Sequence, residues 1–165
     1  MKNLKTQDYH CLEYRKEFCL ELSKIMPASQ VHCGDIHQRQ NWSAKTFDRV
    51  VAIHVLEHLS NLPQAINEIL RLLKDDGVLD IVIPCEGGIA HRTGRKLTAE
   101  RLFNKHFKMD FSPIVKNEHV STYKEIVAVL SDHFHFENQT FFPFFIPVYW
   151  MNFVAGFRLK KKHHS

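Results

Sequence analysis

Short apolar runs alternate with helical patterns over the first half of the chain. Residues 47–53, "FDRVVAI", and 78–84, "VLDIVIP", are rich in valine and isoleucine, which is typical of buried parallel strands. Residues 8–13 and 29–35 are shorter strand candidates, and residues 14–25 between them carry apolar residues at helical spacing. The order strand–helix–strand–strand–helix–strand predicts an α/β fold with a parallel sheet.

The stretch between the two apolar runs gives the clearest helical pattern. Ser60 or Asn61 can cap its start, Pro63 suits its first turn and Gly77 suits its C-terminal cap. We therefore expect one amphipathic helix that buries a single face. The apolar residues of that face are Leu62, Ile66, Ile69, Leu70 and Leu73.

The second half of the chain predicts one firm helix and a hairpin. Residues 86–111 indicate a loop followed by a helix that starts near Thr98. Residues 121–134 predict a helix that opens with the capping box Thr122-x-x-Glu125. The segments "HFENQTFFPF" and "NFVAGFRLKK" then predict two strands, which we expect to pair as a hairpin at the edge of the sheet.

The segment 141–157, "FFPFFIPVYWMNFVAGF", is the most apolar stretch of the chain. It is short for a membrane span, and Pro143, Pro147 and Asn152 interrupt it. We therefore expect no membrane span and interpret the segment as buried strands joined by a turn. A membrane-facing or lipid-substrate surface is the alternative interpretation.

Composition places the chain among ordinary globular proteins. It has 165 residues, of which 44% are hydrophobic and 24% charged, enough for one domain with a sizeable core. Much of the net charge of +4 lies in the tail "RLKKKHHS", so nucleic-acid binding is not expected. The absence of a C-x-x-C pair and of an apolar leader predicts reduced thiols and a cytoplasmic location. The four cysteines are Cys11, Cys19, Cys33 and Cys85.

Residues 54–58, "HVLEH", match the inverted zinc-protease pattern H-x-x-E-H. On a helix, His54 and His58 would share one face and hold a metal, with Glu57 as the base. The segment directly follows a predicted strand, however, and no downstream histidine has a recognisable spacing for a third ligand. We therefore expect no metal site and keep a zinc hydrolase as a remote alternative. The downstream histidines considered are His91, His106 and His119.

The residues on both sides of this segment resemble a different family. Residues 47–84 resemble the central segment of class I S-adenosylmethionine (SAM)-dependent methyltransferases, with Phe-Asp, four apolar residues, the letters V-L-E-H-L, a helix, and a strand ending in proline. The letters "KDDG" replace the family's K-P-G-G. The resemblance implies a Rossmann-like methyltransferase sheet, SAM as cofactor, and a small-molecule methyl acceptor.

The same resemblance implies a set of cofactor-binding residues. Glu13, followed by Tyr14, ends the strand whose acidic residue accepts hydrogen bonds from the ribose hydroxyls. Asp35 is expected at the adenine amino group, Ile36 over the ring, and His54 against the methionine part of SAM. The simpler interpretations are a helix-start residue for Glu13 and a turn at Asp35. His58 is expected to pack under the following helix.

One diagnostic feature of the family is missing. Its first strand ends in a glycine-rich loop, E/D-x-G-x-G-x-G, and no glycine of this chain precedes Glu13. The resemblance therefore implies a truncated sheet without the first strand and first helix. In the family's strand order, 3-2-1-4-5-7-6, that strand lies between strands two and four. Three outcomes are open: strand two pairs with strand four, a second chain fills the gap, or the fragment is not stable alone.

The remaining residues would form the acceptor side. We expect one partial domain over 1–165, with a cofactor-side core at 8–84, an acceptor-side loop and helix at 85–120, and a C-terminal helix with edge strands at 121–165. His91 and His119 are weak candidates for the catalytic base. A catalytically inactive remnant or interaction module of the same fold is the alternative function. Four cations in this region could meet an acidic acceptor or form a solvated face: Arg92, Arg95, Lys96 and Arg101.

Overall fold

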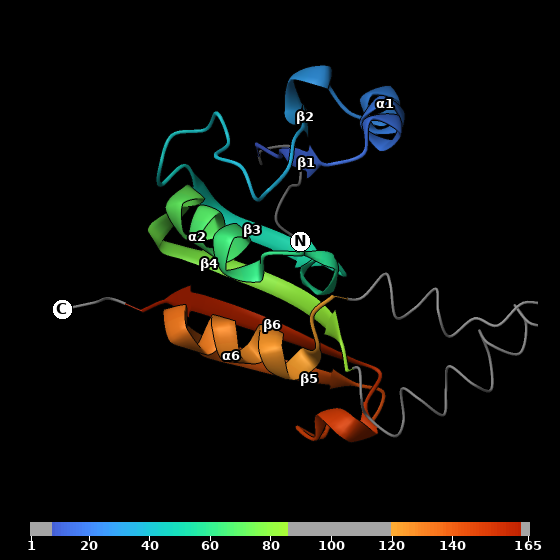
Figure 1. Ribbon diagram of the computed structural model, residues 1–165, viewed down its shortest axis with the longest axis vertical. Helices are drawn as coiled ribbons and strands as arrows, with labels where there is room; N and C mark the ends of the chain where they lie inside the picture. The colour runs from blue at the N-terminus through green and yellow to red at the C-terminus, as the bar shows by residue number, and fades with distance from the viewer. Residues whose placement is uncertain (1–7, 86–119, 163–165) are drawn as a thin grey trace, which may run out of the picture. The chain divides into compact units, whose positions relative to one another are not determined.

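The structure, a computed structural model, describes residues 8–85 and 120–162 (Figure 1). The chain divides into two compact units, Met1–Trp42 and Ser43–Ser165. This boundary falls inside the segment 8–84 that we expected to form one core, and the single-domain organisation stays a prediction. The described helices are α1 (Lys16–Ile25), α2 (Leu62–Leu72) and α6 (Tyr123–His133), with single 3-10 turns η2 (Ala28–Gln30), η3 (Leu56–His58) and η5 (Tyr149–Met151). The described strands are β1 (Cys11–Glu13), β2 (Val31–Cys33), β3 (Phe47–Ile53), β4 (Leu73–Pro84), β5 (Phe134–Phe142) and β6 (Val154–Lys161).

The first unit is a β–α–β arrangement. Strands β1 and β2 pair in parallel, from Cys11 beside Val31 to Glu13 beside Cys33, and α1 connects them. The expected strand–helix–strand order of this region is confirmed.

The prediction of reduced thiols is wrong for two of the four cysteines. Cys19 of α1 and Cys33 of β2 form a disulfide, with their Cα atoms 6.0 Å apart, while Cys11 and Cys85 are free. The two residues are 14 positions apart in sequence, and they meet because α1 turns back beside β2. The spacing of cysteines along the chain gave no sign of this contact.

The second unit contains a four-stranded sheet in the order β3-β4-β6-β5. Strand β3 is parallel to β4, whereas β6 runs antiparallel to both of its neighbours. The expected hairpin is confirmed, with β5 at the edge of the sheet. This order corresponds to strands four, five, seven and six of the resemblance, so the Rossmann-like methyltransferase sheet is confirmed for this part.

One face of this sheet carries the core of the second unit. Helices α2 and α6 lie side by side across that face (Figure 1). The capping box at the start of α6 is formed, and its inward residues Ile126 and Leu130 are fully buried. The sheet residues buried on this side include Leu79, Ile81, Ile83, Phe157 and Leu159.

Helix α2 begins as expected but ends earlier. The Asn61 side chain accepts a hydrogen bond from the Gln64 N–H at 3.2 Å, which confirms Asn61 as the cap. The prediction of Gly77 as C-terminal cap is wrong, because the helix ends at Leu72. The N–H groups of Lys45 and Thr46 donate hydrogen bonds to the last carbonyls of the helix, those of Arg71 and Leu72. The chain therefore enters β4 directly, and Gly77 lies inside that strand.

The three open outcomes for the missing first strand concern strands of different units. Among the described strands, β1 pairs with β2 in the first unit and β3 pairs with β4 in the second. No described strand corresponds to the family's first strand. All three outcomes therefore stay predictions.

The apolar segment 141–157 is only partly buried, so its interpretation as buried strands needs correction. Phe141, Ala155 and Phe157 are in the core, but Phe142 at the end of β5 and five large apolar side chains between β5 and β6 are exposed. Among the helices of the described ranges, none has the length and hydropathy needed to cross a membrane.

Candidate active site

His54 stands where β3 ends, at the carboxyl edge of the parallel pair β3–β4. Its N–H donates to the Val82 carbonyl of β4 at 2.9 Å. Its φ of 52° is in the left-handed region, which few non-glycine residues adopt and which is enriched at functional sites. Open α/β sheets bind their ligands at this edge. The structure thus gives His54 the position that the sequence predicted for it.

A buried carboxylate holds the His54 ring. The Glu57 Oε1 atom lies 3.0 Å from His54 Nδ1, and the Glu57 side chain is 1% exposed while that of His54 is 48% exposed. A carboxylate can only accept a hydrogen bond here, so it selects the tautomer with a proton on Nδ1. The Nε2 atom is then left as a proton acceptor.

Glu57 is itself fixed by the fold. It lies in η3, and its carbonyl accepts hydrogen bonds from the N–H groups of Val120 and Ser121, at 2.8 and 3.1 Å. Its second carboxylate oxygen, Oε2, is buried and has no hydrogen-bond partner in the described part of the chain. Such an atom costs about 1–3 kcal/mol, which makes it unusual in a core that serves stability alone.

The zinc pattern at 54–58 is not realised as a helix. Only Leu56–His58 is helical, as one 3-10 turn, so His54 and His58 do not share an α-helical face. His58 is exposed, which contradicts the expectation that it packs under the following helix. Within residues 8–85 and 120–162, no group of three His, Cys, Asp or Glu side chains could hold a metal ion.

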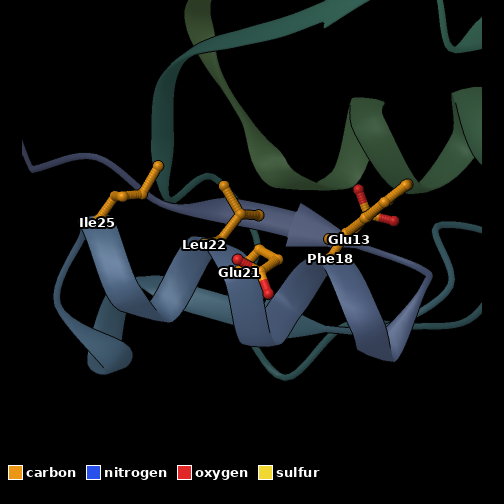
Figure 2. Close-up of a pocket in the computed structure, with 5 residues that line it drawn as sticks. All are labelled: Glu13, Phe18, Glu21, Leu22 and Ile25. Carbon is orange, nitrogen blue, oxygen red and sulfur yellow. The ribbon is translucent and has the colours of Figure 1, made fainter.

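Glu13 lies at the carboxyl end of β1, beside an open pocket of about 420 Å³ on the first unit (Figure 2). The other walls come from α1, where Phe18, Leu22 and Ile25 are apolar and Glu21 is acidic. Glu13 Oε1 accepts a hydrogen bond from the Arg15 N–H at 2.8 Å, as expected for a helix-start residue. No described residue donates to its second oxygen.

Asp35 opens a tight turn after β2. Its Oδ1 accepts hydrogen bonds from the His37 N–H at 2.9 Å and the His37 ring at 2.7 Å. The backbone hydrogen bond from His37 is the main cause that lowers the pKa of Asp35. The turn interpretation is therefore confirmed, while contacts of Asp35 and Ile36 with adenine stay predictions. Tyr14 is 74% exposed beside Glu13.

Comparison with known proteins points to one family. Residues 3–81, just under half of the chain, match the model of the methyltransferase domain family. Together with the fold, this match supports a class I SAM-dependent methyltransferase. SAM is the cofactor of this class of enzyme. No curated protein matches the sequence.

Solved structures agree on the fold of this methyltransferase. A protein from Pyrococcus horikoshii superposes with a TM-score of 0.65 at 14% identity, covering 96% of this chain and 73% of its own. A possible histamine N-methyltransferase from Thermotoga maritima gives 0.63 at 18% identity, covering 92% and 72%. The N-methyltransferase NodS from Bradyrhizobium japonicum, solved with S-adenosylhomocysteine, gives 0.53 at 14% identity, covering 92% and 65%.

Taken by itself, each unit offers one feature that is compatible with part of SAM. The Glu13 carboxylate on its apolar wall suits a ribose whose two hydroxyls need an acceptor. In the second unit, the exposed His54 ring is held by the buried Glu57 at the sheet edge where α/β folds bind ligands, which fits the methionine part of SAM. The glycine-rich segment of the family has no counterpart in the sequence.

Several predicted acceptor residues lie outside the described residues. These are the candidate bases His91 and His119 and the four cations of the same region. In the described part, Glu57 is a candidate site residue that sequence reasoning missed as a partner of His54. The signal was present, because Glu57 follows the strand-ending His54 by three positions, but we considered it only as the base of a zinc site.

Proposed function

We propose that this methyltransferase transfers a methyl group to a small-molecule acceptor, with His54 as the general base and Glu57 as its positioning residue. The observation that carries the proposal is the hydrogen bond between His54 Nδ1 and the buried Glu57 carboxylate at the end of β3. Carboxylate–imidazole pairs are a recurrent way to hold a base in the correct tautomer. The pair also lies at the sheet edge where α/β enzymes bind ligands.

In this proposal, His54 and Glu57 remove the proton that the methyl acceptor loses during the reaction. When bound, SAM supplies an electrophilic methyl group on a sulfonium sulfur that leaves as a neutral thioether. His54 Nε2 accepts the proton that the acceptor's hydroxyl or amine loses as it is methylated. Glu57 keeps Nδ1 protonated and stabilises the imidazolium that results.

The cofactor contacts are proposed residue by residue. Glu13 would accept hydrogen bonds from the ribose hydroxyls, with Tyr14 beside it, and Asp35 and Ile36 would contact adenine. His54 would lie against the methionine part. Support comes from the pocket at Glu13 and from the positions of Glu13 and His54 at the carboxyl ends of parallel strands.

A small molecule is the acceptor class that we favour. The net charge is a modest +4, much of it in the tail "RLKKKHHS", and a similar solved structure is named a possible histamine N-methyltransferase. A second chain that pairs with β3 is a further proposal, since β3 has a described partner, β4, on one edge only. The molar mass in solution tests it, and a strict monomer would contradict it.

The acceptor proposal predicts where a labelled methyl group goes. When the purified chain is incubated with methyl-tritiated SAM and a cell extract, label is expected in the fraction of low molecular mass. Label confined to protein or nucleic acid would contradict the small-molecule class. No transfer above that of heat-denatured chain, to any fraction, would favour the inactive remnant.

A further inference from the structure

The connection between β5 and β6 exposes an unusual amount of aromatic surface. We call residues 142–153, which include η5, the aromatic loop; it lies beyond the ends of the two strands (Figure 1). No residue from Phe141 to Phe157 is charged. Scattered exposed apolar residues are ordinary, but a contiguous group marks a binding surface. Its exposed side chains are Phe142, Phe144, Phe145, Ile146, Trp150 and Phe153.

The aromatic loop is internally braced by one side chain. Asn152 is fully buried, and its Oδ1 accepts a hydrogen bond from the Phe144 N–H at 3.0 Å. Its Nδ2 donates to the carbonyls of Ile146 and Val148, both at 2.9 Å. The Asn152 side chain at the centre of the loop therefore points inward, and both its oxygen and its nitrogen form hydrogen bonds.

Part of the backbone of the aromatic loop is also satisfied within the loop. The N–H groups of Phe145, Val148, Met151, Asn152 and Phe153 all donate to carbonyls at residues 141–149. Pro143 and Pro147 have no N–H to satisfy. Phe145 is held at a φ of 57°, a strained conformation for a bulky residue, yet its side chain is 68% exposed. The internal hydrogen bonds of the loop therefore hold a conformation in which apolar side chains are exposed to solvent.

The base of the loop is anchored to α6. The Tyr149 ring stacks on the Tyr123 ring, with centroids 4.8 Å apart and planes 8° from parallel. The Lys124 ammonium lies 5.7 Å from the centre of the Tyr149 ring, which puts an exposed cation next to the apolar surface. Proteins that contact the membrane–water interface are enriched there in aromatic rings and in lysine or arginine.

These features favour a lipid surface over a protein partner. A protein interface forms about one hydrogen bond per 100–200 Å², whereas the aromatic loop offers outward few polar groups besides those of Tyr149 and Trp150. A bilayer instead favours backbone polar groups that are satisfied internally, as the N–H groups of six loop residues are here. We propose that the aromatic loop docks the protein onto the surface of a lipid bilayer, with Lys124 toward the headgroup phosphates.

Vesicle flotation tests the proposal independently of catalysis. The full chain is expected to float with vesicles of phosphatidylcholine and phosphatidylglycerol. The variant Phe144→Ser/Phe145→Ser/Trp150→Ser is expected to lower the partition coefficient by about 10²- to 10⁴-fold. The control Tyr9→Ser/Leu20→Ser removes two comparably exposed apolar side chains of the first unit and is expected to float like the wild type.

A spectroscopic readout locates the contact. The chain has two tryptophans, so Trp42→Phe leaves Trp150 as the sole reporter, and its emission is expected to shift to the blue on binding vesicles. An unshifted Trp150, or equal flotation of the wild type and the loop variant, would overturn the proposal. A wild-type dimer that becomes monomeric in the loop variant and does not float would instead assign the loop to a second copy and overturn it as well.

Discussion

Replacing His54 by alanine is expected to lower kcat for methyl transfer by about 10²- to 10⁴-fold, the range in which a positioned general base contributes. The Kd for SAM should rise by no more than about tenfold, because a single side-chain contact is lost. Single-turnover rates with saturating SAM measure the first effect, and calorimetry measures the second. A His54→Ala enzyme with the wild-type kcat would remove His54 from the mechanism.

The substitution Glu57→Met is expected to change kcat and the free energy of unfolding in opposite directions. Glu57→Met keeps the length of the side chain and removes the unpaired buried oxygen, so the free energy of unfolding should rise by about 1 kcal/mol and the melting midpoint by about 2–4 °C. Meanwhile kcat should fall about 10- to 100-fold, with KM for SAM nearly unchanged, because the tautomer of His54 is no longer fixed.

The exposed Glu17→Met provides the matched control, which should alter neither quantity appreciably. A Glu57→Met protein that unfolds would indicate that the carboxylate serves the fold. A stable variant with full kcat would show that Glu57 does not position His54.

Replacing Asn152 by alanine is expected to cost about 2–4 kcal/mol of the free energy of unfolding. Three hydrogen bonds of about 1 kcal/mol each are lost, and two carbonyls and one N–H are left without that partner inside the aromatic loop. Chemical denaturation measures the loss, and hydrogen exchange at Phe144 should report local opening of the loop.

Asn138→Ala is the control, because Asn138 is an exposed asparagine of β5 in the same hairpin. Its effect should be within about 0.5 kcal/mol. If both variants lost the same stability, the hydrogen bonds of Asn152 would not be what braces the loop.

The pattern of the sequence predicted most of the second unit. The bounds of β3 were given by "FDRVVAI", and the start of α6 by Thr122 and Glu125, because buried strands and capping boxes use local signals. The letters after β3 also gave His54 its place at the sheet edge. Each of these features depends on residues within a few positions of one another.

What failed depends on contacts between distant segments. Gly77 looked like a helix cap, but Lys45 and Thr46 end the helix four residues earlier. Cys19 and Cys33 meet only once α1 turns back on β2. Hydropathy could not distinguish the buried Phe141 from the exposed Phe145, because both are apolar and the fold alone decides which faces inward.

Binding of SAM by the purified chain tests the central claim most directly. Isothermal calorimetry is expected to give a saturable heat with about one site per chain and a Kd between about 1 and 100 μM. Glu13→Gln should weaken binding about tenfold through the loss of a charged acceptor, and Glu17→Gln should leave it unchanged. An absence of heat with SAM at about 1 mM would contradict the account, because a chain that does not hold the cofactor cannot transfer its methyl group.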